Sequence, residues 1–486
     1  MMKKILYSLL FIVPVVGAYA DDNESSPPVV NLNSQYIDRW AYSQDPYIGL
    51  PSLVGKQIVS ESQMANQNVA QRWFADGTWN VYSGATASYN GFSSSQGFPN
   101  GNGYPIYAYG TNVFAQTGYV AGFSFGGMVS LANPIGAGNM NGYHENGNPF
   151  VPANAIASVP EAFIEYMYQN LVQVDVGYIG ITNSPWLGGT YYSNQITPFA
   201  TYQGAMVNVY PGAGWLLTAI AFNAAQFSGN LGFNSQTLYN KGVYDGYSGI
   251  ISNANVHDGS SAGTVALGAN YMGWGNNYNA RLWAYQFENY GTLLYADNSL
   301  KLTANKDLAF NFAAQGGTDN QVGGNTNALV NNSLGQISSN FVGGQIGATY
   351  DWASLNLSFD SIWGPQTAYG GGGIVSPYTF ADGLDPLYAE GWITNLVNMG
   401  IGGTIYKINP SFSFLDNNLT ISPAFTTLVT GNSQWSGTNE AFATVSYSLP
   451  QVRGLTVWAQ YAYQWVPQQN TTGDNWGTQL FVSYNY

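Results

Sequence analysis

Cysteine is absent from this 486-residue sequence, and charged residues are scarce. A chain without cysteine has no disulfide framework to stabilise it. Charged residues make up 7% of the chain, whereas roughly a quarter is usual in soluble proteins, which cover their surface with lysine and glutamate. Beyond residue 20, no uninterrupted apolar run reaches the ~20 residues that a membrane-spanning helix needs. The composition therefore disfavours both a soluble globular protein and a helical membrane protein.

Basic residues are especially scarce in this chain. Its 11 lysine and arginine residues face 25 aspartate and glutamate residues, which gives a net charge of −14. Lys3 and Lys4 belong to an N-terminal leader, and their removal leaves 11 − 2 = 9 basic residues and a net charge of 9 − 25 = −16. This balance argues against nucleic acid as a partner. If the charge lines a pore, it favours cations.

Glycine, tyrosine and tryptophan are abundant instead, with 59, 37 and 14 residues. From Trp79 onwards, apolar and polar residues alternate in about eighteen segments of roughly ten residues each. In the last segment, Asn475–Tyr486, the residues Val482, Tyr484 and Tyr486 occupy every second position. A period of two is that of a β-strand with one apolar face. The pattern predicts an all-β fold: a transmembrane antiparallel up-and-down β-barrel of about 18 strands over residues 78–486.

The residues before this barrel form two further segments. Residues 1–20 combine two lysines, an apolar run from Ile5 to Val16 and a small-residue ending, which predicts a cleaved secretory signal peptide. Residues 21–77 alternate poorly, and we expect an N-terminal periplasmic or lumenal segment. The sequence leaves open whether this segment lies inside the barrel, caps it or precedes it.

The predicted connections fall into two length classes that alternate along the chain. If the aromatic C-terminus lies on the periplasmic rim, the periplasmic turns are mostly short and the extracellular loops mostly long, as in outer-membrane barrels. The short turns include Gln169–Leu171, Pro211–Gly214, Trp274–Asn277, Thr303–Lys306 and Asp351-Trp352, and the long loops include Asn133–Ser158, Thr182–Ala200, Ser228–Ser261, Gly316–Asn340 and Trp363–Leu396. A soluble β-sandwich has no reason to sort its loops in this way.

Alternation also separates an inner face from a lipid face. Leu355, Leu357 and Phe359 share one face of a strand, and Asp360 lies on the other. A lysine or arginine on the lipid face near the midplane costs ~2–4 kcal/mol, so charged strand residues are expected to point inwards. We therefore expect a polar lumen and a water-filled channel. The candidates for pore-lining or constriction residues are Glu161, Glu165, Asp175, Arg281, Asp360, Asp382, Asp385, Glu390 and Glu440.

Two stretches carry a family resemblance. Gly177–Pro185 (GYIGITNSP), followed by Ile196–Gly204 (ITPFATYQG), and the C-terminal run with Gly454-Leu455 and Asp474-Asn475 resemble OprD-like outer-membrane porins. The resemblance is spread loosely over Trp79–Tyr486. It implies an eighteen-stranded channel for small hydrophilic solutes such as amino acids or peptides.

The sequence departs from that family in its arginines. Family members that take up carboxylates resemble one another in an arginine ladder along the pore. Here the only arginines are Arg39, Arg72, Arg281 and Arg453. A carboxylate-selective pore is therefore not the expectation.

The loop Trp363–Leu396 is the main candidate for a constriction. It contains the glycine run Gly370–Gly373 and the acidic residues Asp382, Asp385 and Glu390. Such a loop either folds into the barrel, where its carboxylates attract cations, or lies exposed on the surface. The sequence leaves both alternatives open.

Other chemistry finds little support. The pairs His144-Glu145 and His257-Asp258 fall in predicted loops and lack a third metal ligand, so we expect no metal, no cofactor and no catalytic residues. The expected partners are outer-membrane lipid and lipopolysaccharide, small hydrophilic solutes, and the outer-membrane assembly machinery, which would read the C-terminal strand. Whether the chain is a monomer or a homotrimer stays open.

Three functions compete at this point. The favoured one is a diffusion porin for small hydrophilic solutes with a mild cation preference, rather than an enzyme. The second is a hydrophobic-substrate transporter with an N-terminal hatch, which an apolar lumen would indicate. The third is a surface adhesin or structural barrel that conducts nothing.

Overall fold

The computed structural model describes residues 78–92, 105–135, 155–169, 171–181, 183–187, 200–227, 231–237, 261–275, 277–324, 335–378, 385–452, 454–467 and 474–485. The predicted signal peptide and the N-terminal segment 21–77 lie outside these residues. So do Asp382, both histidine pairs and the terminal Tyr486.

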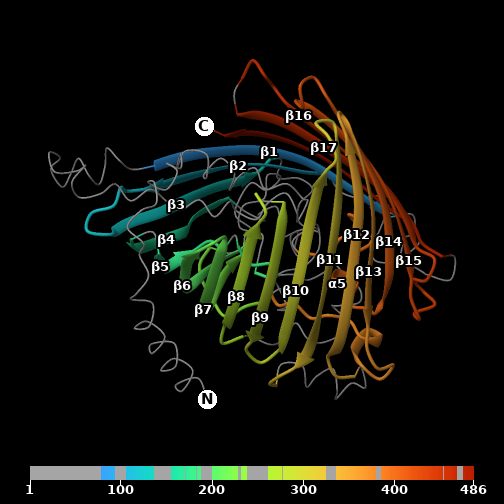
Figure 1. Ribbon diagram of the computed structural model, residues 1–486, viewed down its shortest axis with the longest axis horizontal. Coiled ribbons are helices and arrows are strands. Elements are labelled where there is room, and N and C mark those ends of the chain that lie inside the picture. Colours follow the sequence, from blue (N-terminus) through green and yellow to red (C-terminus); the bar gives the residue numbers. More distant parts are fainter. Residues whose placement is uncertain are drawn as a thin grey trace.

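Eighteen antiparallel strands form one closed sheet, drawn in Figure 1. Each strand pairs with its neighbours in sequence, and β1 pairs with β18, for example Tyr82 with Asn485, which closes the barrel. The strands are β1 (Thr78–Phe92), β2 (Pro105–Gln116), β3 (Phe123–Pro134), β4 (Ile156–Tyr168), β5 (Val172–Ile179), β6 (Ala200–Gly212), β7 (Trp215–Phe227), β8 (Thr264–Gly273), β9 (Tyr278–Phe287), β10 (Gly291–Thr303), β11 (Leu308–Gln321), β12 (Ser338–Tyr350), β13 (Ala353–Trp363), β14 (Gly403–Phe414), β15 (Leu419–Val429), β16 (Asn439–Ser448), β17 (Leu455–Trp465) and β18 (Asn475–Asn485). The predicted barrel of about 18 strands is confirmed.

Helix is rare in the described residues. The two short helices are η4 (Tyr369–Gly371) and α5 (Leu396–Met399), and both lie in the loop between β13 and β14. Within the described ranges, no helix has the length and apolarity needed to span a membrane.

The alternation predicted from the sequence separates the two faces of the wall. On β13, Leu355, Leu357 and Phe359 are exposed on the outside, while Ser358 and Asp360 are buried on the inside. The outer face is apolar in the same way on other strands, including β11 with Phe310 and Phe312. An apolar exterior around a closed sheet leaves no unpaired strand edge, as a barrel in lipid requires.

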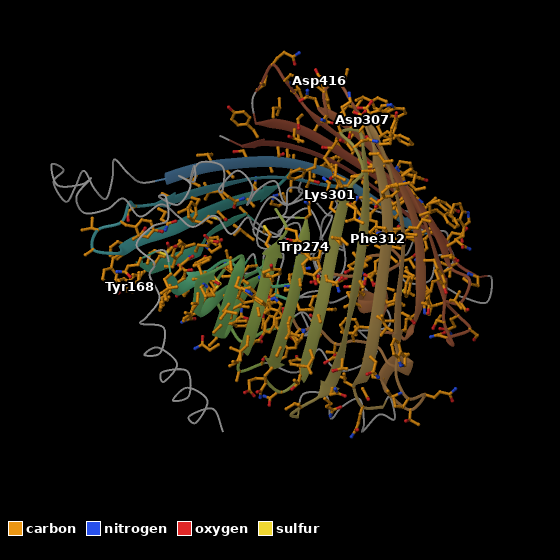
Figure 2. All side chains as sticks on the ribbon, in the orientation of Figure 1. Tyr168, Trp274, Lys301, Asp307, Phe312 and Asp416 are labelled. Carbon is orange, nitrogen blue, oxygen red and sulfur yellow. The ribbon has the colours of Figure 1, made fainter. Side chains whose placement is uncertain are left out.

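The two ends of the barrel differ as predicted. At one end, which we call the short-turn end, neighbouring strands are joined by brief turns such as 213–214, 274–277, 304–307 and 351–352. Figure 2 labels Trp274, Asp307 and Asp416, which lie in the turns between β8 and β9, between β10 and β11, and between β14 and β15. The opposite end, the long-loop end, carries the long connections, including residues 364–402 between β13 and β14.

Three strands differ from the sequence prediction by more than three residues at a boundary. Alternation predicts a strand over Val397–Ile408, but α5 occupies the start of that range and β14 runs from Gly403 to Phe414. Alternation predicts a strand over Gly118–Ala132, but β3 begins only at Phe123. Ala121 (φ 51°) and Gly122 (φ 84°) form a turn, and the residues before it continue the alternation without being part of the strand. In β11 the strand runs on to Gln321, through a stretch that lacks apolar residues. Pairing with β10 and β12 continues there and supplies the backbone hydrogen bonds.

Candidate functional site

The loop between β13 and β14 folds into the barrel. We call its described residues, 364–378 and 385–402, the strap. Ile374, Ala389 and Val397 are completely buried, and Figure 1 shows the label α5 within the barrel outline, behind the strands. Of the two alternatives that the sequence left open, the structure therefore has the inward one.

One part of the strap is held by aromatic rings. Tyr378 packs edge-on against Phe222 of β7 and Tyr202 of β6, with ring centroids 5.0 and 6.0 Å apart. Phe227 and Phe287 complete its surroundings at 6.3 Å each. Burial of the ring raises the pKa of Tyr378 to about 12, so its hydroxyl stays protonated.

Another part of the strap is held by Glu440, the second residue of β16. Its Oε1 accepts hydrogen bonds from the backbone N–H of Trp392 (2.8 Å) and Ile393 (3.0 Å), and its Oε2 accepts from Ile393 (3.1 Å) and Thr394 (2.6 Å). The Thr394 hydroxyl also accepts a hydrogen bond from Gln464 Nε2 on β17 at 2.8 Å. The strap thus extends from contacts on β6 and β7 to contacts on β16 and β17.

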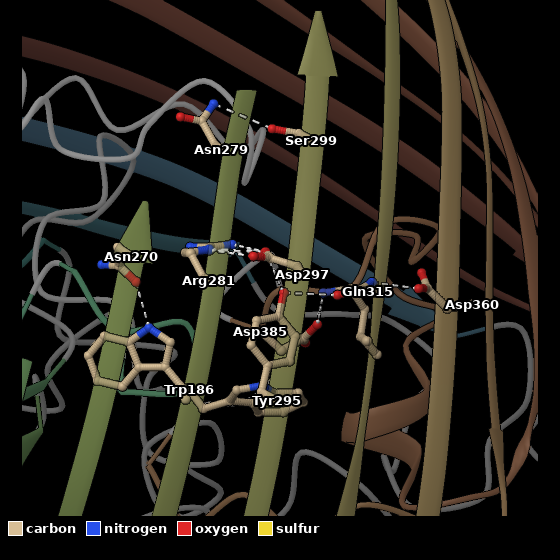
Figure 3. A network of polar contacts seen from close by, with 12 residues as sticks. Trp186, Asn270, Asn279, Arg281, Tyr295, Asp297, Ser299, Gln315, Asp360 and Asp385 are labelled. Carbon is tan, nitrogen blue, oxygen red and sulfur yellow. Dashed lines mark hydrogen bonds and ion pairs between the residues drawn. The ribbon is translucent and has the colours of Figure 1, made fainter. Parts of the chain in front are cut away.

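Between these points the strap meets a network of polar residues on the wall, shown in Figure 3. The backbone N–H of Ala389 donates to Asp360 Oδ2 on β13, and Gln315 Nε2 on β11 donates to Asp360 Oδ1 at 2.7 Å. Gly343 of β12 lies between Gln315 and Asp360 in the strand register. A Cβ atom at position 343 would lie 2.0 Å from Asp360 Oδ1, so the glycine leaves the space that this hydrogen bond occupies.

The same network continues to Arg281 on β9. The Tyr295 hydroxyl lies 3.1 Å from Gln315 Oε1 and 2.8 Å from Asp297 Oδ2, so two acceptors share its proton. Asp297 on β10 accepts from Arg281 Nε at 2.9 and 3.0 Å and forms an ion pair with its terminal nitrogen. Arg281 is expected to point inwards because a charge facing lipid is costly, and its side chain lies on the inner face. Because the guanidinium is already paired, Arg281 is not an isolated cation.

Two acidic residues of the strap lie close to Asp360 and Lys407. Asp385 accepts hydrogen bonds from the Leu387 N–H (3.0 Å) and from Asn395 Nδ2 (3.1 Å). Burial raises the pKa of Asp385 to about 6. Burial, and then the charges of Asp385 and Asp360, raise the pKa of Glu390 well above its ordinary value. The Lys407 ammonium donates to the Glu390 carbonyl oxygen at 3.2 Å. This group therefore binds protons more readily than carboxylates in water do.

A second inward segment comes from the connection between β5 and β6. Trp186 is completely buried and meets Tyr295 and Phe341 edge-on, with centroids 6.2 and 5.9 Å apart. Ser184 Oγ lies 2.9 Å from the Tyr285 hydroxyl. Together with the strap, this segment covers the ring-bearing inner face of β6–β12, which we call the aromatic wall. Its members are Tyr202, Phe222, Phe227, Trp283, Tyr285, Phe287, Tyr295 and Phe341.

The inner face of β1–β5, which we call the polar wall, has a different composition. Its buried polar members include Asn112, Gln116, Ser124, Ser130, Glu161, Glu165, Gln173 and Asp175, and the apolar side chains of Phe114, Met128 and Met167 are buried beside them. Glu165 and Asp175 lie directly opposite each other on β4 and β5. Gln173 Nε2 lies 3.2 Å from Glu165 Oε2 and 2.8 Å from Asp175 Oδ2, and so bridges two like charges.

The candidate residues predicted from the sequence thus fall into three groups. Asp360, Asp385 and Glu390 lie together where the strap meets β13 and β14, and the polar network links them to Arg281. Glu440 holds the strap on β16. The third group is Glu161, Glu165 and Asp175 on the polar wall.

Sequence reasoning missed Asp297 and Asp319. Asp319 Oδ2 accepts the Val375 N–H of the strap at 2.9 Å, but its position had been assigned to a loop. Asp297 was overlooked although Arg281 needs a carboxylate partner. Pairing the two neighbouring strands across their short connection would have placed Asp297 opposite Arg281.

The fold matches solved structures of outer-membrane porins. Pseudomonas aeruginosa OpdK, solved with vanillate, aligns with a TM-score of 0.63 at 16% identity, over 85% of this chain and 99% of that chain. Acinetobacter baumannii OccAB3 aligns with a TM-score of 0.65 at 12% identity, over 85% of this chain and 100% of that chain. A BenF-like porin from Pseudomonas fluorescens Pf-5 has the same TM-score and identity, with 85% and 99% coverage.

No family model matches the sequence, and no curated protein matches it. At such low identity, the structural likeness concerns the fold. The chain has the eighteen-stranded fold of these porins, and the resemblance inferred from its sequence is confirmed at that level.

Proposed function

We propose that this chain is an outer-membrane porin, a passive channel for small hydrophilic solutes, and not an enzyme. The observation that carries the proposal is a closed eighteen-stranded barrel with an apolar exterior, whose interior is crossed by a strap. Barrels of ~16–18 strands are wide enough to hold an aqueous channel, which inward loops can narrow. The shared fold of OpdK, OccAB3 and the BenF-like porin supports this function.

The proposed solute pathway runs between the strap and the polar wall, and it favours cations. Strands β1 to β5 contain no lysine or arginine, whereas Glu161, Glu165 and Asp175 all lie on their inner face. A wall with carboxylates and no fixed cation raises the local concentration of positive ions.

Carboxylate solutes fit this interior less well. Two solved structures with the same fold name vanillate and glucuronate as bound molecules, and both molecules are carboxylates. A pore that selects such anions needs accessible positive charge. Of the described strand cations, Arg281 is buried and paired with Asp297, Lys407 donates to the Glu390 carbonyl, and Lys301 is exposed near the short-turn end. We therefore propose neutral or cationic solutes, such as amino acids and peptides.

The aromatic wall does not favour the hydrophobic-substrate transporter. Tyr285, Phe287 and Tyr295 are buried beneath Trp186 and Tyr378, so these rings serve as the packing surface of the inward segments. The N-terminal hatch that such a transporter would need falls on residues outside the described ranges.

The remaining partners follow from the outer surface. Leu480, Val482 and Tyr484 of β18 are exposed on the outside, facing the proposed lipid and lipopolysaccharide. We propose that this last strand is also the signal that the assembly machinery recognises. Both a lipid-surrounded monomer and a homotrimer are compatible with the apolar exterior.

Single-channel recording in planar bilayers tests the proposed function. The purified, refolded protein should show steady open steps, and its reversal potential in a salt gradient should have the sign of cation preference. The triple variant E161Q/E165Q/D175N should shift the reversal potential towards zero, because it removes the charge of the polar wall.

The matched control is D416N, which removes a charge from an exposed turn at the short-turn end. It should leave the reversal potential unchanged. Bilayers that stay silent, although gel mobility shows a folded barrel, would overturn the porin and favour the adhesin.

A further inference from the structure

Glu440 stands out among the buried carboxylates because three consecutive backbone N–H groups converge on it. The donors are Trp392, Ile393 and Thr394, at 2.6 to 3.1 Å, and the side chain is completely buried. Successive N–H groups that point to one concavity form an anion-binding nest. In this nest the anion is supplied by the barrel wall itself.

The geometry suits a carboxylate better than a neutral group. A buried carboxylate is costly unless hydrogen bonds satisfy both of its oxygens, and here both oxygens accept from the strap. Gly391 allows this close approach, since a Cβ atom at position 391 would lie 2.3 Å from Glu440 Oε2. The strap backbone is therefore shaped around this side chain.

Glu440 attaches one part of the strap to the barrel wall, and Tyr378 attaches another part. Tyr378 holds the strap on β6 and β7, whereas Glu440 holds it on β16. On the β16 side, Gln464 adds a hydrogen bond from its amide to the Thr394 hydroxyl, and Asn475 in turn donates to Gln464 at 2.6 Å. Releasing the β16 attachment would free the segment that lies across the barrel while leaving the aromatic attachment in place.

We propose that Glu440 is a positioning residue whose carboxylate fixes the strap across the barrel, so that the channel stays steadily open. This inference rests on the proposed function, since a strap that moves in and out of the pathway would interrupt the current. It assigns Glu440 to the strap and not to contact with solutes.

The test combines E440A with a thiol probe. The chain has no cysteine, so V397C introduces a single reporter at a position that is completely buried in α5. In E440A/V397C the thiol should react with a maleimide at least about tenfold faster than in V397C, because hydrogen bonds to a charged group are lost. Single-channel records of E440A should show frequent closures.

Chemical rescue distinguishes loss of the hydrogen bonds between Glu440 and the strap from a general loosening of the barrel. Formate, at constant ionic strength, should slow the labelling of E440A/V397C and reduce its closures, because it can occupy the empty nest. The matched control E161A/V397C removes a buried carboxylate from the polar wall and should label at the V397C rate, with or without formate. Gel mobility of the unheated proteins verifies that each barrel is folded.

Equal labelling of E440A/V397C and V397C would overturn the proposal, and so would faster labelling that formate does not reverse. If wild-type protein itself gives no current, the porin function fails, but labelling and its rescue still decide the role of Glu440. The two failures are therefore distinguishable.

Discussion

The polar wall and the aromatic wall are halves of one interior and both are buried, yet their side chains differ in chemistry. On β1–β5, carboxylates such as Glu165 are bonded to amides and hydroxyls of neighbouring strands, including Gln116 Nε2 at 3.2 Å. On β6–β12, rings such as Trp283 and Tyr285 stack with centroids 5.6 Å apart and are sealed beneath loop segments. The same barrel thus has one half held by polar hydrogen bonds and one half that packs against the strap.

The aromatic wall gives the strap a hydrophobic core inside a membrane barrel. Rings of this size bury large apolar areas, and their burial stabilises a loop that would otherwise lie in water. The polar network then fixes where the strap lies, since Asp319, Asp360 and Glu440 each accept backbone N–H groups from it. Burial of apolar side chains attaches the strap to the barrel wall, and the hydrogen bonds to these carboxylates fix its position on the wall.

The largest expected effect comes from the ion pair on the aromatic side. R281L leaves Asp297 buried without its cation, and breaking such a pair costs ~3–5 kcal/mol. We expect a corresponding loss in the free energy of unfolding, measured by urea titration in detergent. R281L/D297L should recover most of it, because no unpaired charge remains. A loss below ~1 kcal/mol in the single variant would show that the pair does not stabilise the aromatic side.

A smaller effect is expected from G343A. The new methyl group would lie 2.0 Å from Asp360 Oδ1 and 2.8 Å from Gln315 Nε2, so their hydrogen bond must break. We expect a loss of ~1–3 kcal/mol in the free energy of unfolding and faster labelling of the V397C thiol. G431A is the control, because a Cβ atom there meets nothing within 4 Å. Equal behaviour of both variants would mean that the Gln315–Asp360 bond does not hold the strap.

The strap should also respond to pH. The pKa of Asp385 is raised from 3.8 to about 6 in the inward position, so protonation favours that position. The Asp385 contribution to the stability of the inward position should therefore grow as the pH falls from about 6 towards about 4, and Glu390, whose pKa is also raised, acts in the same direction. Channel closures should be fewer at pH 5 than at pH 8.

Two comparisons check this dependence. D385N removes one of the two titrating groups and should reduce the difference between the two pH values, whereas D416N should retain it. More closures at pH 5 than at pH 8 in the wild-type protein would contradict the assigned direction.

Sequence patterns predicted the wall of this barrel well and its contents poorly. Strand alternation depends on local chemistry, because lipid demands apolar residues at every second position, and so the inward placement of Asp360 could be read directly. Alternation predicts a polar lumen, but Trp283 and Tyr285, which share a strand face with the inward Arg281, are rings buried on the inside. A period-two pattern identifies these positions as apolar. It does not distinguish a strand face that contacts lipid from one that packs against an inward loop.

The inward fold of the strap depends on contacts between residues far apart in sequence. Trp392 and Glu440, which form a hydrogen bond, are 48 positions apart in the sequence, and no local sequence pattern predicts such a pair. The glycine run Gly370–Gly373 is compatible with both an exposed loop and an inward one, and in the structure the Gly402 N–H donates to the Gly370 carbonyl oxygen at 2.7 Å. Glycine marks both mobile loops and close packing, so composition alone could not choose between the two structures.

The smallest effect is expected on the polar wall, where Q173L removes the amide that bridges Glu165 and Asp175. Each carboxylate loses one hydrogen bond, and we expect the free energy of unfolding to fall by ~1 kcal/mol. The strap has no described contact with Gln173 and is held by β6–β17 residues, so labelling of V397C should stay at its reference rate. Faster labelling in Q173L/V397C would show that the two walls are coupled, and the separation of the polar wall from the strap would then be wrong.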